Sequence, residues 1–239
     1  MKTSIPYTLK VSRRARSARL RMMPHEGLVV VIPVGFDRRE VPALVERHRE
    51  WVERTAARLE QHRRPEEPLL EGGLPGLLRF GLTGEEWSLS YDGSRRRPLE
   101  DICSAPFGLV LPVDPSDGEA AMAVLHLWLK KRARQILFPM LGEAARQMGF
   151  SFVSSSVRLQ HSRWGSCSSK GRITLNIKLL FLPPELVRYI IVHELCHTVH
   201  MNHSKAFWSL VARHEPEYAR LDREMRHAWR FVPAWVAAS

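Results

Sequence analysis

The chain has 239 residues, 44% of them hydrophobic and 26% charged, which is an ordinary composition for a globular protein. It contains no apolar run of about 18 residues or more, so the sequence predicts neither a membrane-spanning helix nor a membrane partner. The basic N-terminus lacks the apolar core of a signal peptide. Cys103, Cys167 and Cys196 are odd in number and form no Cys-x-x-Cys pair. A reducing compartment is therefore expected, and the sequence predicts a cytoplasmic protein.

Positive charge is in excess, with 36 lysines and arginines against 25 aspartates and glutamates. A division after Pro112 gives net charges of +4 before it and +7 after it, so the excess looks spread along the chain. Small basic clusters occur at 13–16, 95–97 and 130–134. Solvated faces explain such clusters in most proteins, and association with nucleic acid is the alternative.

Residues 1–112 predict a β-rich region. Alternating and β-branched residues between Tyr7 and Val34 predict two strands, with a hairpin turn at 25–27. Asp37 is placed to cap a helix that reaches about Gln61. Short strands are expected at Leu77–Leu82, Trp87–Tyr91 and Gly108–Leu111. The expected arrangement is a mostly antiparallel sheet with one helix across it.

Residues 113–239 predict a second region, richer in helices. Asp117 is expected to cap a helix running to about Met148, which Pro139 should kink or split. Strands expected at 150–159 and 172–180 are joined by a loop of small residues, which predicts a hairpin. Three helices follow, the last two at 204–214 and 216–227. Strands followed by helices without regular alternation indicate an α+β fold.

The segment His193-Glu194-Leu195-Cys196-His197 stands at the centre of the second region. On a helix, His193 and His197 lie one turn apart on the same face, so both imidazoles can reach one ion. Pro183-Pro184-Glu185 provides a helix start, and the apolar residues around the motif predict a buried helix. The alternative is a core helix whose histidines are only hydrogen-bonded.

A third nitrogen ligand is available at His203, ten residues after His193. Three protein ligands with one open position are typical of a catalytic zinc ion, Zn²⁺, and one ion per chain is expected. Glu194 is then placed to accept a proton from a metal-bound water, and hydrolysis of a polypeptide substrate uses this set best. Glu215, Glu217 and Glu224 compete with His203 as third ligand. His200 is expected outside the ligand set.

Several segments together resemble one family. They are Arg163–Cys167, Ile173–Asn176, His193–His197, Asn202–Ser204 and Phe207-Trp208, and they are similar to the YgjP-like metallopeptidases. The resemblance covers nearly the whole chain. It implies a zincin-type catalytic core with a β-rich N-terminal extension, with His193, His197 and His203 as ligands and Glu194 catalytic. A more distant similarity to the SprT-like proteases rests on the ten-residue offset of the third histidine.

Other details of the site stay open on the sequence. The strand at 172–180 is either the sheet edge that pairs with substrate or an interior strand. Trp164 either contacts substrate or plugs the core. Tyr189, Tyr218 and His214 are equal candidates for stabilising a transition-state oxyanion. Two other functions compete with the peptidase: a nucleic-acid-binding protein with a structural zinc, and a protease recruited to DNA-bound proteins.

Overall fold

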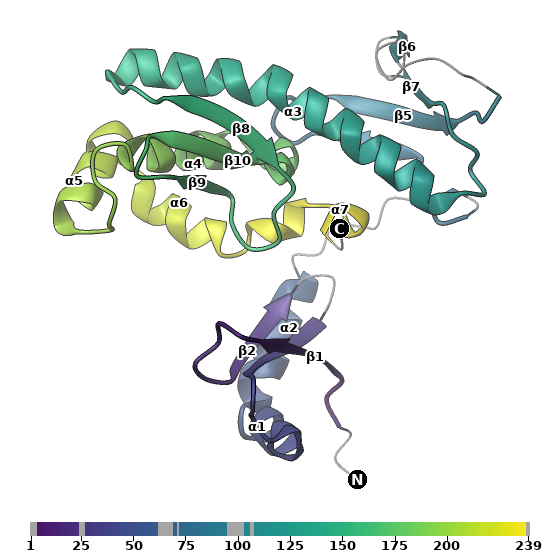
Figure 1. Ribbon diagram of the computed structural model, residues 1–239, viewed down its shortest axis with the longest axis vertical. Coiled ribbons are helices and arrows are strands. Elements are labelled where there is room, and N and C mark those ends of the chain that lie inside the picture. The colour runs from purple at the N-terminus through teal and green to yellow at the C-terminus, as the bar shows by residue number, and fades with distance from the viewer. Residues whose placement is uncertain are drawn as a thin grey trace. The chain divides into compact units, whose positions relative to one another are not determined.

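The computed structural model describes residues 4–23, 27–61, 69–70, 72–94, 103–105 and 108–237 (Figure 1). Its contacts divide the chain into two compact units, Met1–Pro65 and Glu66–Ala237. They are called here the N-terminal unit and the C-terminal unit. Across the described ranges, no helix combines the length and the apolar character needed to cross a membrane.

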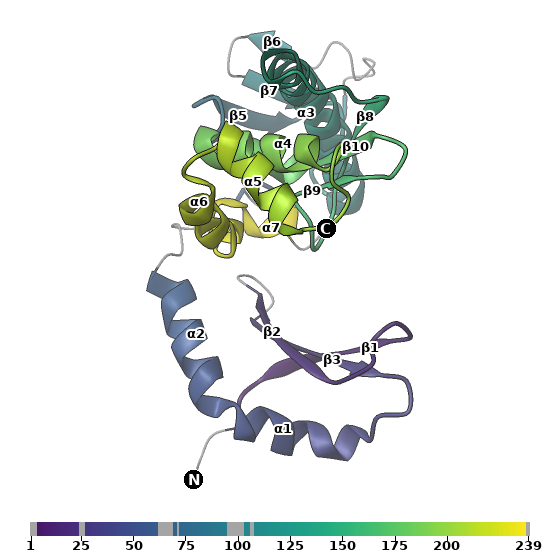
Figure 2. The ribbon, with the colours of Figure 1, turned by 90° about the vertical axis from the view of Figure 1, so that its left-hand side faces the viewer.

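The N-terminal unit is a three-stranded sheet covered by helices. Strands β1 (Tyr7–Ser12), β2 (Arg19–Met23) and β3 (Gly27–Pro33) take the order β1-β3-β2, with β1 parallel and β2 antiparallel to β3. A 3₁₀ turn η1 (Arg38–Glu40) leads into α1 (Val41–Arg47) and α2 (Arg49–Gln61) (Figure 2). Because side chains alternate along a strand, one face of β3 enters the core. That core contains Leu28, Val30, Ile32, Val41, Val45 and Val52.

Two expectations for this unit need correction. Three strands replace the expected two, and β1 joins the sheet parallel to β3 rather than antiparallel. The single helix expected after Asp37 is interrupted at His48. There the ring nitrogen Nδ1 lies 2.9 Å from the Leu44 carbonyl, and the His48 amide bonds Val45 instead. Asp37 does cap the first turn, accepting from the Arg39 amide at 2.9 Å. The turn expected at 25–27 lies largely outside the described residues.

The C-terminal unit begins with a four-stranded sheet. Strands β4 (Leu77–Arg79), β5 (Glu86–Tyr91), β6 (Cys103–Ala105) and β7 (Gly108–Leu111) take the order β4-β5-β7-β6. The β5–β7 pair is parallel, so the expectation of one mostly antiparallel sheet over residues 1–112 is wrong. Helix α3 (Gly118–Met148) follows, with Asp117 accepting from the Ala120 amide at 3.0 Å. Pro139 does not split α3, because it lies on the exposed side, where water can satisfy the freed carbonyl.

A second, three-stranded sheet lies alongside α3. It contains β8 (Ser154–Arg158), β9 (Gly165–Cys167) and β10 (Arg172–Asn176) in the order β8-β10-β9. The expected hairpin is wrong, because β8 and β10 are parallel and β9, within the connecting segment, is the antiparallel partner of β10. The remaining elements are η3 (Ile177–Phe181), α4 (Pro184–Cys196), α5 (Lys205–His214), α6 (Tyr218–Met225), η4 (Ala228–Phe231) and α7 (Ala234–Ala237).

One core joins both sheets of the C-terminal unit through α3 (Figure 1). Near its N-terminal end, Trp128 of α3 packs edge-on against Trp87 of β5, with ring centroids 5.1 Å apart. Farther along, α3 contacts β8 and α4. Residues 66–112 therefore belong with the C-terminal unit. The division expected after Pro112 does not coincide with the division by contacts, because it cuts through this shared core. Helices beside small sheets confirm the α+β class.

Candidate metal site

Helix α4 carries the first part of the site. Pro184 occupies its first turn and Glu185 places a carboxylate at the positive end of the helix dipole, as the sequence indicated. The helix is apolar on nearly all sides and is buried among α3, α5, α6 and β9. His193 lies in its last turn, and His197 is the residue at which it ends. The buried helix therefore holds both imidazoles on a fixed backbone.

Three imidazoles converge at the end of α4. The ligand atoms of His193, His197 and His203 lie within 4.8 Å of one another, and they are the described His, Cys, Asp and Glu side chains that form such a group. The Nε2 atoms of His193 and His203 are 3.1 Å apart. Two nitrogens on one tetrahedral zinc would be separated by about 3.3 Å, given zinc–nitrogen bonds of about 2.0–2.1 Å. The donor set and its spacing fit one metal ion.

The orientation of His197 is set by a backbone group. Its Nδ1 lies 2.9 Å from the carbonyl oxygen of His200. A carbonyl only accepts, so Nδ1 carries the proton and Nε2 keeps its lone pair for a ligand. His200 thus acts through its main chain, while its own imidazole stays outside the three-histidine group. Its expected place outside the ligand set agrees with this geometry, but the role of its carbonyl was not predicted.

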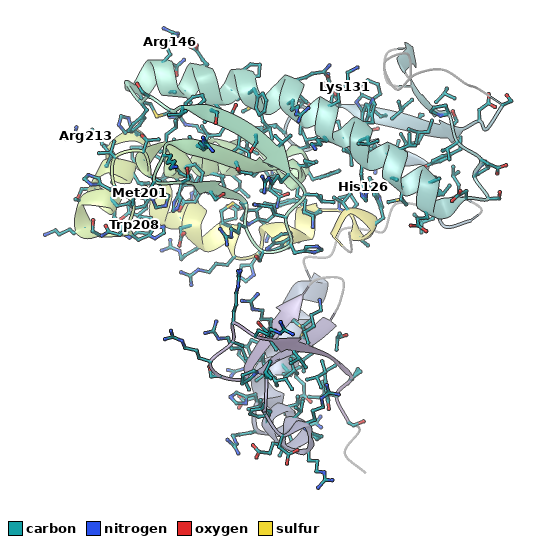
Figure 3. All side chains as sticks on the ribbon, viewed as in Figure 1. His126, Lys131, Arg146, Met201, Trp208 and Arg213 are labelled. Carbon is teal, nitrogen blue, oxygen red and sulfur yellow. The ribbon has the colours of Figure 1, made fainter. Side chains whose placement is uncertain are left out.

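Helix α5 supplies an apolar wall to the group. Phe207 is fully buried and stacks on His197, with ring centroids 4.4 Å apart. Trp208 lies beside His203 at 5.6 Å. Figure 3 labels Trp208 and Met201, from the turn after α4, at the same end of the C-terminal unit. Burial and the neighbouring His197 and His203 lower the pKa of His193 to about 4, so its ring is neutral near pH 7 and able to bind a metal.

Glu194 is the buried carboxylate of the site. It is only 5% exposed, and its Oε2 has no hydrogen-bond partner among the described residues. Burial raises its pKa to about 8, and the positive charge of Arg163 opposes this shift. A Cβ atom built on Gly165 of β9 would come within 2.6 Å of Oε1 and 2.7 Å of Cγ. Glycine at 165 therefore makes the space that the Glu194 side chain occupies.

A buried amide holds the segment that precedes β9. Asn176 is fully buried, and its Nδ2 donates to the carbonyls of Gln160 at 2.9 Å and Arg163 at 2.7 Å. The backbone N–H of Asn176 also donates to the Trp164 carbonyl at 2.9 Å. Trp164 packs on Trp229, with ring centroids 4.3 Å apart, which favours the packing interpretation of its role. These contacts fix the approach of β9 to Glu194.

The competing third ligands lie in ion pairs elsewhere. Glu215 pairs with Arg188 at 3.1 Å, while Glu217 and Glu224 both pair with Arg220. None of these carboxylates belongs to the three-histidine group.

Two of the three oxyanion candidates are engaged in other contacts. The Tyr189 hydroxyl is buried and donates to Asp222 at 3.0 Å. The His214 ring packs against Phe150 at 5.0 Å. Tyr218 stacks on Trp208 at 5.5 Å, and Trp208 in turn lies beside His203. Among the described ring contacts of the three candidates, the contact of Tyr189 with His193, at 5.9 Å between centroids, is the one that reaches the three-histidine group.

The strand beside the site is β9 rather than β10. β10 lies between β8 and β9, so the interior-strand alternative holds for 172–176, and β9 forms the edge. The Trp164 carbonyl and the Ser168 amide both bond toward β10. Because backbone groups alternate along a strand, those of Gly165 and Cys167 point to the outer edge. The sequence did not indicate β9, because three residues within a loop of small side chains give no periodic signal.

An α+β core built around a helix that carries two imidazoles and a buried carboxylate, with a third imidazole just past its end, defines the class of metal-dependent hydrolases. The YgjP-like, metallopeptidase domain model matches residues 16–228. The chain therefore belongs to the YgjP-like metallopeptidase family, which confirms the resemblance found in the sequence. Family membership supports a hydrolase of the peptidase type that uses a metal.

Two individual proteins are also similar. A stretch of 59 residues, 24% of this chain, is 34% identical to an Escherichia coli (strain K12) protein named UTP pyrophosphatase. The match spans 35% of that protein, so the chain covers about a third of the length of this curated relative. A solved crystal structure, the metallopeptidase zymogen of Pyrococcus abyssi abylysin, shares 31% identity. It covers 38% of this chain and 93% of its own, with a TM-score of 0.34.

Proposed function

We propose that this protein is a zinc-dependent peptidase in which His193, His197 and His203 bind the ion and Glu194 is the general base. The observation that carries the proposal is the convergence of three imidazole ligand atoms within 4.8 Å beside a buried carboxylate with a free oxygen. Three side-chain ligands leave one coordination position for water or substrate. A structural zinc would have a fourth protein ligand, and the group of described residues has three members.

A zinc ion held by His193, His197 and His203 would supply a Lewis acid and would lower the pKa of a bound water toward about 7. Glu194 then has two tasks, which are to accept a proton from the attacking water and to pass it to the leaving amine. Burial raises the pKa of Glu194 to about 8 in the metal-free site. The charge of a bound zinc ion would lower it again, so that the ionised carboxylate is present near pH 7 to accept the proton. The His200 carbonyl keeps His197 in the tautomer that presents Nε2.

A polypeptide substrate has a binding edge in β9. The outward backbone groups of Gly165 and Cys167 can pair with an extended peptide, adding a strand to the sheet β8-β10-β9. Gly165 packs on Glu194, so a peptide paired with β9 lies next to the general base. This placement supports a peptide bond as the target, because a backbone edge recognises a main chain rather than a particular side chain.

The test uses the purified full chain, loaded with zinc, and an unstructured protein such as casein as substrate. The wild type should bind one zinc per chain and cleave the substrate, and removal of zinc by a chelator should abolish cleavage until zinc is restored. Glu194→Gln should keep its zinc and lose cleavage by at least about a hundredfold, the lower end of general acid–base contributions. Cleavage at wild-type rates by Glu194→Gln would refute the mechanism.

A second candidate function is hydrolysis of a nucleoside triphosphate to the monophosphate and pyrophosphate. It is favoured by the name of the E. coli relative, UTP pyrophosphatase. The same site serves this reaction, because a metal can polarise a phosphoryl oxygen as it does a carbonyl. Pyrophosphate release from UTP, measured with the same preparations, separates the two. Turnover of UTP, with no cleavage of any unstructured protein, would favour the pyrophosphatase.

We also propose that the protein works in the cytoplasm. Cys167 and Cys196 are free thiols, and burial raises the pKa of Cys196 to about 12. Free cysteines suit a reducing compartment. Localisation of a tagged full-length chain in cell fractions tests this placement.

A further inference from the structure

Most of the net positive charge lies in the N-terminal unit. Residues 1–65 hold 15 lysines and arginines against 7 aspartates and glutamates, a formal net charge of +8. Residues 66–239 hold 21 against 18, a net charge of +3. Dividing the chain after Pro112 makes the net charge look evenly spread only because that boundary groups residues 66–112 with the basic N-terminal unit. The structural division places the excess on one small unit.

Charge is further separated within this unit. Residues 1–25 contain seven lysines and arginines and no aspartate or glutamate. The helices contain both signs and pair them, since Arg49 bonds Glu46 at 2.7 Å and Glu53 at 3.0 Å, and Arg54 lies 3.7 Å from Glu50. Residues 37–61, which form the helices, hold six basic and six acidic residues and are neutral overall. Six of the eight net charges therefore belong to residues 1–36, the sheet and its connections, and the other two are Arg63 and Arg64.

The pleat of the sheet places basic side chains on the face opposite the core. Leu20 and Met22 of β2 pack on the core, so Arg19 and Arg21 point to the other face, and both are exposed. Lys10 of β1 and Arg19 of β2 flank Val31 in register, which puts them two strand spacings, about 10 Å, apart. This face, with Thr8, Lys10, Arg19 and Arg21 around the buried Val29 and the half-buried Val31 of β3, is called here the basic face. The helices lie on the other side (Figure 2).

The connection from β1 to β2 extends the basic face. It carries Arg13, Arg14 and Arg16, all of them exposed. Within the described part of the chain, no carboxylate pairs with these three arginines or with Arg19 and Arg21. Five guanidinium groups are therefore available to an anionic partner, and each can bind a phosphate through two parallel hydrogen bonds.

We propose that the basic face binds the phosphate backbone of double-stranded DNA. A duplex carries about one charge per 1.7 Å of its axis, a density that suits several guanidiniums on one face. The basic face has no aromatic ring among its described residues, and single-strand binding relies on such rings for base stacking. Duplex RNA also offers phosphates, together with 2′-hydroxyls that are recognised across its minor groove, so it is compared with duplex DNA in the test. The 13–18 connection has no large apolar residue to anchor it in a membrane. This inference goes beyond the proposed hydrolysis and does not depend on it.

The experiment measures binding of the full chain to an arbitrary 20-base-pair DNA duplex by fluorescence anisotropy at several salt concentrations. The test variant is Arg13→Gln/Arg14→Gln/Arg16→Gln. The matched control is Arg134→Gln/Arg213→Gln/Arg223→Gln, which removes the same charge from exposed positions of the C-terminal unit (Figure 3 labels Arg213). The test variant should lose at least about tenfold in affinity and lower the salt slope by about 2–3, since each phosphate contact contributes about 0.9. The control should bind within about twofold of the wild type.

Four outcomes would overturn the proposal. They are absence of duplex binding by the wild type at low salt, equal losses in the two variants, tighter binding of single-stranded DNA or duplex RNA than of duplex DNA, and Arg13-dependent binding to anionic lipid vesicles without duplex binding. Glu194 lies in the C-terminal unit and outside the basic face, so Glu194→Gln should bind DNA as the wild type does. Loss of cleavage with retained binding would count against neither this proposal nor the zinc site.

Discussion

The two units of the chain differ in charge, in core size and in chemistry. The N-terminal unit has a net charge of +8 and, among described residues, six buried apolar side chains in its core. The C-terminal unit has a net charge of +3, a core that spans two sheets, and the three-histidine group. The more basic unit is thus not the one that contains the candidate metal site, so net charge does not indicate where the site lies. Binding of an anion and hydrolysis can be separated by substitutions in different units.

The largest expected effect follows from removal of a ligand. His203→Ala leaves two imidazoles, too few for a stable zinc site, so bound zinc should fall from one per chain to nearly none. Hydrolysis should fall at least about a thousandfold, because the metal contributes several kcal/mol to the transition state. Metal analysis after dialysis and a cleavage assay measure both. Lys205→Ala, an exposed neighbour, is the control. Full zinc retention in His203→Ala would remove His203 from the ligand set.

A core substitution in the N-terminal unit should have the complementary effect: it should unfold that unit and leave hydrolysis by the C-terminal unit in place. Ile32 is 1% exposed, and Ile32→Ala should cost about 2–5 kcal/mol. A small core cannot absorb such a loss, so the N-terminal unit should unfold while hydrolysis stays within about twofold. Hydrogen exchange resolved by segment measures the unfolding. Val34→Ala, at a residue 66% exposed, should leave exchange unchanged. Simultaneous loss of hydrolysis in Ile32→Ala would show that the two units depend on each other.

The contact between Gly165 and Glu194 predicts a smaller effect within the C-terminal unit. In Gly165→Ala the added methyl group meets the Glu194 carboxylate, so that side chain must move. A shift of about 1 Å at a reacting group can cost about a hundredfold, and we expect kcat/KM to fall ten- to hundredfold with zinc content unchanged. The control is Gly142→Ala, where nothing lies within 4 Å of the added Cβ. Equal activity in both alanine variants would mean that the contact is without consequence.

The smallest expected effect concerns a helix cap. Asp117 accepts from the Ala120 amide at the start of α3, and Asp117→Ala should lower the free energy of unfolding of the C-terminal unit by about 1 kcal/mol. Thermal unfolding monitored by circular dichroism measures this change. Asp117→Asn keeps an accepting oxygen and should retain most of the stability. A loss as large as that of the alanine variant would assign the effect to charge instead of the cap.

Features that depend on neighbours in the chain were determined by the sequence itself. The spacing of His193 and His197 follows from the helical period, and Asp37 and Asp117 begin helical segments through bonds to amides two or three residues ahead. The place of His203 just beyond α4 follows from the same local reasoning. Such features are readable because the interacting groups are fixed by a repeat of known geometry.

The tertiary structure decided what depends on distant contacts. The parallel pairing of β8 with β10, the position of β9 at the sheet edge and the packing of Gly165 on Glu194 join residues far apart in sequence. The sequence also did not show that residues 66–112 share a core with α3. Because the expected boundary was placed after Pro112 instead, the concentration of net charge in residues 1–65 was not visible from the sequence. Strand order and core membership arise from long-range burial, which leaves no periodic signal in any single segment.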